Sequence, residues 1–156
     1  MRNSASSFGD FRCAHCHVVV SSAHFLSGVN NRNHCPYCLW SCHLDLYAAG
    51  DRLCACKGQM KPIGLTMKNS KNKYQLDKRG ELMLVHQCIE CANLSINRIA
   101  ADDDASTIIE IFQASVENQS HIIFERHGIL MLNLHDAKIL YKQLYGGEIE
   151  MSARIW

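Results

Sequence analysis

Short runs rich in apolar residues and bounded by turn-forming residues occupy the first two thirds of the chain and predict β-strands. The predicted strands are Val18–Val20, Ile63–Met67, Lys73–Leu76 and Glu81–His86. Asp77–Gly80 has the residues of a hairpin turn between the last two strands. Leu39–Ala49 instead predicts a short helix that ends at Gly50. This part of the chain is therefore expected to form a small sheet with short connections.

The last third of the chain has apolar residues at helical spacing. Ala105–Glu117 places Ile108 and Phe112 on one face, and the three aspartates at 102–104 suit an N-cap. The remaining predicted elements are the strands His121–Glu125 and Ile129–Leu134, a turn at Gly128 between them, and a helix, Asp136–Tyr145, that stops at Gly146. We therefore expect an extension with mixed helix and strand.

Charge divides the chain at nearly the same place. Residues 1–100 hold twelve Lys and Arg against six Asp and Glu, whereas residues 101–156 hold four against nine. The net charge of +1 therefore conceals a basic front and an acidic tail. We expect one domain over residues 1–104 and an extension over residues 105–156 that packs on it.

Composition excludes several classes of protein. With 47% hydrophobic and 20% charged residues, the 156-residue chain can bury a core and does not have the composition of a disordered protein. No run approaches the roughly 18 apolar residues of a membrane span, and the first residues lack the apolar segment of a secretory signal. We therefore expect a cytoplasmic protein without membrane contact, whose cysteines stay reduced.

Metal binding is the leading explanation for the nine cysteines, which all lie between residues 13 and 91. Six of them form Cys-x-x-Cys pairs: Cys13 with Cys16, Cys35 with Cys38, and Cys88 with Cys91. This spacing lets two thiolates converge on one tetrahedral ion from a tight turn, and repeated pairs are typical of zinc sites. An iron–sulfur cluster also needs four thiolates, whereas a redox motif normally has one pair in a βαβ unit. The expected fold is a small α+β domain with a zinc-ribbon or zinc-knuckle core of short strands and a C-terminal α/β extension.

Two Zn²⁺ ions per chain are expected, because six paired cysteines exceed one tetrahedral site and fall two ligands short of two. We assign Cys13, Cys16, Cys35 and Cys38 to one site, and Cys88, Cys91, His43 and Cys56 to the other. Cys42 adjoins His43, so the two side chains point in different directions and only His43 is expected to reach the ion. This reasoning decides less well between Cys54 and Cys56, because both can face the same side of a strand. His34 and His86 are further candidate ligands.

The segment Arg32–Asp45, RNHCPYCLWSCHLD, resembles the signature of the RNHCP domain family. Further segments resemble the family in the same order along the chain: Phe11–Cys16, Gly50–Arg52, Cys56–Ile63, His86–Cys91 and Asn97–Asp103. The resemblance covers roughly residues 10–104, and residues 105–156 have no counterpart in it. It implies zinc and a type of fold, but no particular reaction.

The resemblance also implies a ligand set. The positions that match the family's Cys and His pattern are the eight residues assigned above, and Cys42 and Cys54 fall at positions that the pattern leaves open. His17 and Ala92 depart from the family, which usually has Gly after the second Cys of a knuckle. Because Gly permits a positive φ, the turns at these two residues are expected to be strained or rearranged.

A basic strip leads to a functional hypothesis. The strip consists of Lys57, Lys61, Lys68, Lys71, Lys73, Lys78 and Arg79 and is opposed only by Asp77. Together with Arg32, which lies next to a knuckle, it suits phosphate contacts, while Tyr37 and Trp40 suit stacking on bases. We expect a non-catalytic zinc module that binds RNA or a ribosome-associated partner.

Two alternative functions stay open. In an HNH-like nuclease, His43 would be the general base and Asp45 would help to hold a second metal. His43 cannot take that role while it ligates zinc. In a protein-interaction adapter, the acidic extension over residues 105–156 would bind a protein partner. The sequence leaves the oligomeric state open.

Overall fold

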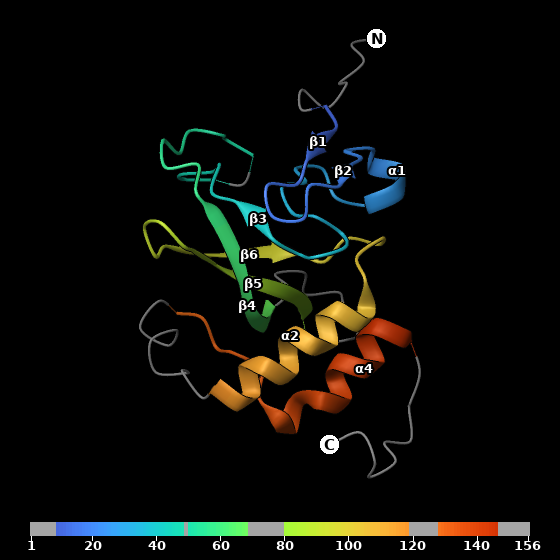
Figure 1. The fold of residues 1–156 in the computed structure, drawn as a ribbon. Coiled ribbons are helices and arrows are strands. Elements are labelled where there is room, and N and C mark those ends of the chain that lie inside the picture. Colours follow the sequence, from blue (N-terminus) through green and yellow to red (C-terminus); the bar gives the residue numbers. More distant parts are fainter. Residues whose placement is uncertain (1–8, 49, 69–79, 119–127, 147–156) are drawn as a thin grey trace.

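The computed structural model describes residues 9–48, 50–68, 80–118 and 128–146. Its elements are β1 (Phe11–Arg12), β2 (Val19–Val20), α1 (His24–Ser27), β3 (Ser41–Cys42), β4 (Gln59–Lys68), β5 (Glu81–Cys88), β6 (Leu94–Arg98), α2 (Ala105–Asn118), the 3-10 turn η1 (Leu134–Asp136) and α4 (Ala137–Tyr145). Figure 1 shows β1, β2 and α1 at one end of the molecule, α2 and α4 at the opposite end, and the larger sheet between them. The small α+β fold with a zinc-ribbon-like core is confirmed.

The larger sheet is antiparallel and has the strand order β3-β4-β5-β6. Met60 of β4 pairs with Cys88 of β5, and Leu65 pairs with Leu84, with a register shift between Pro62 and Gly64. The two long strands confirm the predictions for Ile63–Met67 and Glu81–His86. The sequence analysis missed β6, although Leu94-Ser95-Ile96-Asn97 alternates as a half-buried strand does.

The hydrophobic core lies between this sheet and the two C-terminal helices. Its buried residues come from the sheet (Leu65, Leu82, Leu84), from α2 (Ile108, Phe112), from α4 and the segment before it (Leu132, Ala137, Leu140) and from Leu39. The described parts of α2, of α4 and of the segment before α4 therefore share a core with the sheet. A Cβ on Gly64 would lie 2.0 Å from Met131 Cε and 3.1 Å from Ser115 Cβ, so a larger residue there would displace the end of the Met131 side chain.

The ends of both helices follow the predicted signals. Asp104 caps α2, because its carboxylate accepts the Thr107 N–H at 2.9 Å and the Thr107 hydroxyl. These two bonds lower the pKa of Asp104. Helix α4 ends at Gly146, whose φ of 71° closes the last turn. No helix among the described residues is long and apolar enough to cross a membrane.

Two predicted elements are wrong. Residues 39–48 contain β3 and a loop instead of a helix, because β3 pairs with the start of β4 and Asp51 accepts the N–H groups of residues 46–48. Ile129–Leu134 forms no strand; it contacts β4 through an isolated bridge between Thr66 and Met131. The predicted strands Lys73–Leu76 and His121–Glu125 lie outside the described residues.

Candidate metal centres

The first cluster joins the β1–β2 hairpin to the turn that follows Arg32. Its four members are Cys13, Cys16, Cys35 and Cys38. Cys13 Sγ lies 3.6 Å from Cys38 Sγ, and Cys16 Sγ lies 3.6 Å from Cys35 Sγ. The antiparallel pairing of Phe11 with Val20 places the first Cys-x-x-Cys pair at the tip of the hairpin. Around it, Cys13, Val20 and Cys35 form a small buried cluster of their own.

The second cluster lies at the end of the larger sheet and consists of His43, Cys56, Cys88 and Cys91. Cys56 Sγ lies 3.7 Å from Cys88 Sγ, and Cys91 Sγ lies 3.3 Å from His43 Nδ1. The sheet brings these distant residues together, because β3 pairs with the start of β4 and the start of β4 pairs with the end of β5. Gly58 also makes room, since a Cβ there would lie 2.9 Å from Cys88 Sγ.

Both clusters fit zinc. The ligand atoms of each cluster all lie within 4.8 Å of one another. With Zn–S bonds of about 2.3 Å and tetrahedral angles, two thiolates lie about 3.8 Å apart, close to the observed 3.6–3.7 Å. A disulfide would bring the sulfurs to about 2.05 Å, and the cysteines are free. The expectation of two zinc sites per chain, with four protein ligands each, is therefore confirmed.

The three Cys-x-x-Cys turns have the same backbone geometry. In each, the first Cys carbonyl accepts the N–H four residues later: His17 to Cys13 (2.9 Å), Leu39 to Cys35 (2.9 Å) and Ala92 to Cys88 (3.0 Å). The donors His17, Leu39 and Ala92 have φ of 65°, 60° and 62°. The turns at His17 and Ala92 are therefore not rearranged; they keep the conformation that suits Gly, with the strain of a side chain at positive φ.

Backbone N–H groups stabilise the thiolates that zinc requires. A bond from the Val18 N–H is the largest cause that lowers the pKa of Cys16. Burial acts to raise the pKa of Cys88, but bonds from the N–H groups of Cys91 and Glu90, together with the side chains of Cys91 and His43, lower it to about 7. Burial raises the pKa of Cys35, although the Cys38 and Tyr37 N–H groups bond to its sulfur. The turns thus offer oriented donors to the ligand sulfurs.

The other candidate ligands belong to neither cluster. Cys42 and Cys54 stand apart, and burial raises the pKa of the Cys42 thiol. His86 is fully buried, with Nε2 donating to the Leu39 carbonyl at 2.7 Å and Nδ1 accepting from Asn97 Nδ2 at 2.9 Å. Burial is the main cause that lowers the pKa of His86 to about 4. His86 therefore stays neutral and joins the second knuckle to the sheet.

Arg32 is placed differently from the sequence-based expectation. Its side chain is 1% exposed, and it donates to Asp102 at 2.8 Å and to Asp103 at 3.2 Å. Asp103 also accepts from His34 Nε2 at 2.7 Å. We call these four residues the Arg32 lock, because they tie the second knuckle to the residues before α2. A contact between Arg32 and nucleic acid does not fit this burial, and nothing local in the sequence signals a partner 70 residues away.

Part of the basic strip lies within the described residues. Lys57, Lys61 and Lys68 are exposed, the last two on β4. Lys71, Lys73, Lys78 and Arg79 lie outside the described residues. Of the aromatic candidates, Tyr37 is 63% exposed, whereas Trp40 stacks on His15 with ring centroids 4.0 Å apart. Tyr37 is therefore the more accessible ring.

Comparison with known proteins agrees with this geometry. The family model described as RNHCP domain matches residues 8–109, about two thirds of the chain and all eight clustered ligands. No curated protein and no solved structure gave a significant match.

Proposed function

This chain belongs to the RNHCP domain family, and we propose that its two zinc clusters form the scaffold of a non-catalytic module that binds RNA. That the chain is a zinc-binding module follows from the family and from the two clusters. RNA as the partner, including RNA within the ribosome, and a cytoplasmic location are the proposed part. The observation that carries the proposal is the exposure of three lysines on β4 and the ligand turn before it.

The metal sites support a structural role for zinc. Each cluster supplies four protein ligands, and such closed sites leave no position for substrate or activated water. Catalytic zinc sites normally have three protein ligands and an open fourth position. Zinc in this module therefore stabilises the fold, and the residues around the zinc sites would bind the RNA.

The two residues on which the nuclease alternative depends are engaged in other contacts. His43 Nδ1 points into the second cluster, 3.3 Å from Cys91 Sγ. Each Asp45 oxygen accepts a backbone N–H, from Gly50 at 2.8 Å and from Arg52 at 3.1 Å, so this carboxylate holds its own loop. A general base needs a free electron pair, which His43 lacks while it ligates zinc, so this arrangement favours structure over hydrolysis.

The adapter alternative also loses support. The acidic extension buries Ile108, Phe112, Leu132 and Leu140 in the core that it shares with the sheet. These apolar residues are therefore used within the chain. A partner would have to bind the remaining exposed residues, such as Leu130 and Leu134.

Lysines explain how RNA would be held. Lys57 follows the ligand Cys56, and Lys61 and Lys68 lie on β4, so the zinc cluster and the sheet fix where these cations sit. Each phosphate that a lysine neutralises releases counterions, which makes binding depend steeply on salt. The sequence continues the strip through Lys71 and Lys73.

The test is a titration of fluorescently labelled RNA at several salt concentrations. Replacing Lys68, Lys71 and Lys73 with Ala should weaken binding and reduce the salt slope by roughly one unit for each of these lysines that neutralises a phosphate. Zinc content and melting temperature should hardly change, because exposed lysines add little stability. Unchanged RNA affinity in the triple variant contradicts the proposal. Cleavage of RNA with added Mg²⁺, lost in Asp45→Ala, would favour the nuclease.

A further inference from the structure

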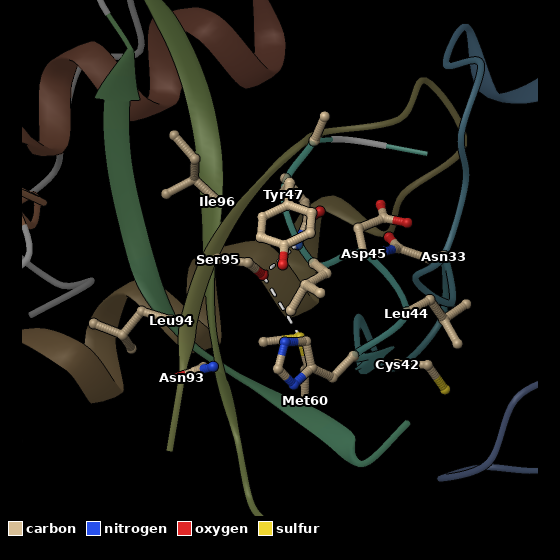
Figure 2. Close-up of a pocket in the computed structure, with 14 residues that line it drawn as sticks. Asn33, Cys42, Leu44, Asp45, Tyr47, Met60, Asn93, Leu94, Ser95 and Ile96 are labelled. Carbon is tan, nitrogen blue, oxygen red and sulfur yellow. Dashed lines mark hydrogen bonds between the residues drawn. The ribbon is translucent and has the colours of Figure 1, made fainter. Parts of the chain in front are cut away.

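A cleft with a volume of about 320 Å³ lies between β6 and residues 42–48, and we call it the β6 cleft. Figure 2 shows Asn93, Leu94 and Ser95 on one side and Asn33 and Asp45 on the other. Its volume is at the lower end of small-ligand pockets, which span about 300–1,000 Å³. The cleft therefore has room for one small group rather than for a large ligand.

Carboxylates hold one wall of the cleft rigidly. Asp51 accepts the N–H groups of Leu46 (2.9 Å), Tyr47 (2.8 Å) and Ala48 (2.9 Å), and Asp45 accepts those of Gly50 and Arg52. The bonds to Asp51, that from Leu46 first, hold its pKa well below the usual range. The loop conformation is thus fixed by its own hydrogen bonds, without packing from the Tyr47 side chain.

This rigid wall presents an aromatic ring to solvent. Tyr47 is 85% exposed although it lines the cleft, and Figure 2 shows its ring between Asp45 and Ser95 in projection. A large ring on a fixed loop can stack on a ligand with little further loss of conformational entropy on binding. The ring adds nothing to the hydrophobic core, so it is free to stack on a ligand.

Two side-chain amides of the cleft are uncharged and available. The side-chain amides of Asn33 and Asn93 make no hydrogen bond to any described residue. An amide offers one acceptor and two donors and pairs well with the edge of a nucleobase. Among the described residues of the lining, Asp45 is the one carboxylate and is engaged by Arg52, and none is a lysine or arginine. A phosphate would therefore find no cation inside the cleft.

We infer that the β6 cleft binds one unpaired nucleobase of a single-stranded RNA, an inference that rests on the proposed function. The base stacks on Tyr47, and opposite edges of it pair with the amides of Asn33 and Asn93. The phosphates stay outside the cleft, because none of the described residues that line it is a lysine or arginine. A base held in a duplex cannot enter, because its edge is paired and its faces are stacked.

The experiment measures binding of the zinc-loaded full chain to a labelled single-stranded RNA and to the same RNA in a duplex. Tyr47→Ala should weaken single-strand binding about tenfold or more, the loss typical of one stacked base, with an unchanged salt slope. Tyr47→Phe should retain most of the affinity, because it keeps the ring. Phe25→Ala is the matched control, since Phe25 is 86% exposed on α1 and does not line the cleft. Asn93→Ala should alter the relative affinities of the chain for the four RNA homopolymers, poly(A), poly(C), poly(G) and poly(U).

Different failures have different meanings. If the lysine triple variant loses affinity but Tyr47→Ala and Asn93→Ala bind as well as the unchanged chain, RNA binding stands and the nucleobase site is overturned. If the unchanged chain binds no RNA, the proposed function fails, and NMR titration with the four nucleosides decides about the cleft. Shifts of the Asn33 and Asn93 side-chain amides would retain it as a nucleobase site, and their absence would reject it. Shifts along β6 with an extended peptide, but not with nucleosides, would identify a peptide site instead.

Discussion

Residues 9–58, which we call the metal-held segment, contain three two-residue strands and one four-residue helix among their described residues. The opposite end of the molecule, the helix-covered core, pairs a ten-residue and an eight-residue strand under helices of 14 and nine residues. The metal-held segment buries little more than Cys13, Val20 and Cys35 around its first cluster. Where a chain has few apolar residues to bury, coordination bonds supply the stability that a hydrophobic core supplies elsewhere.

The two regions meet at Leu39. Its side chain is fully buried in the helix-covered core, while its N–H closes the second knuckle and its carbonyl accepts from His86. The Arg32 lock makes a second junction, from the knuckle to the residues before α2. Loss of zinc should therefore disturb the core at these junctions but leave its centre packed.

The largest expected effect comes from removing the metal. Structural zinc contributes about 10–16 kcal/mol per ion in small zinc peptides, so a strong chelator should unfold the metal-held segment. Hydrogen exchange should then be fast throughout residues 9–58 and remain slow at the centre of β5 and α2. Equal loss of protection in both regions would show that the helix-covered core has no stability of its own.

Single ligands give the next largest effect and separate the clustered cysteines from the others. Cys56→Ala and Cys88→Ala should each lose one equivalent of zinc and unfold part of the metal-held segment, because a site with three ligands no longer closes. Cys42→Ala and Cys54→Ala are the matched controls and should keep both ions, with a loss of stability of about 1 kcal/mol. Elemental analysis and thermal melting measure both results, and equal damage from all four substitutions would reject the assignment of ligands.

The Arg32 lock should show a smaller but clear effect. Arg32→Met leaves Asp103, which is fully buried, without its cation, and breaking such a buried pair typically costs about 3–5 kcal/mol. Arg98→Met is the control, because Arg98 pairs with Glu81 on the surface and such pairs contribute about 0–1 kcal/mol. Urea unfolding followed by fluorescence compares the two variants. Similar midpoints would mean that the lock does not couple the two regions.

The smallest effect concerns the strained knuckle turns. Ala92→Gly should relieve a positive φ that costs a side chain about 1–2 kcal/mol, offset in part by the entropy of glycine, for a net gain of up to about 1 kcal/mol. Leu39→Gly relieves the same φ but removes a buried leucine, so it should lower the melting temperature. Calorimetry on the zinc-loaded chains tests the pair, and a loss of stability in Ala92→Gly would contradict the account of strain.

Local signals in the sequence predicted much of the structure. The spacing of the Cys-x-x-Cys pairs predicted the three turns, the periodicity of Ala105–Glu117 predicted α2, and Gly146 predicted the end of α4. Each of these depends on residues within a few positions of one another. The eight proposed ligands converge as the two predicted groups of four. The prediction succeeded because the order of the Cys-x-x-Cys pairs along the chain left few ways to assign them to two sites.

The errors share a different cause, since each depends on distant residues. Leu39–Ala49 has a helical composition, but the second knuckle sets Leu39 at a positive φ, and Asp51 captures the N–H groups of the loop. Arg32 seemed available for RNA because its partners, Asp102 and Asp103, are 70 and 71 residues away. The β6 cleft likewise arises only when Tyr47 and Asn93 are brought together by the sheet.

The most direct test of the account is the zinc content of the purified chain, measured by elemental analysis together with titration of its thiols. Two closed sites predict about two equivalents of zinc per chain, with the seven clustered cysteines unreactive until a chelator is added and only Cys42 and Cys54 outside the sites. Less than one equivalent of zinc, with all nine thiols free in the folded chain, would contradict the conclusion that metal holds this end of the molecule.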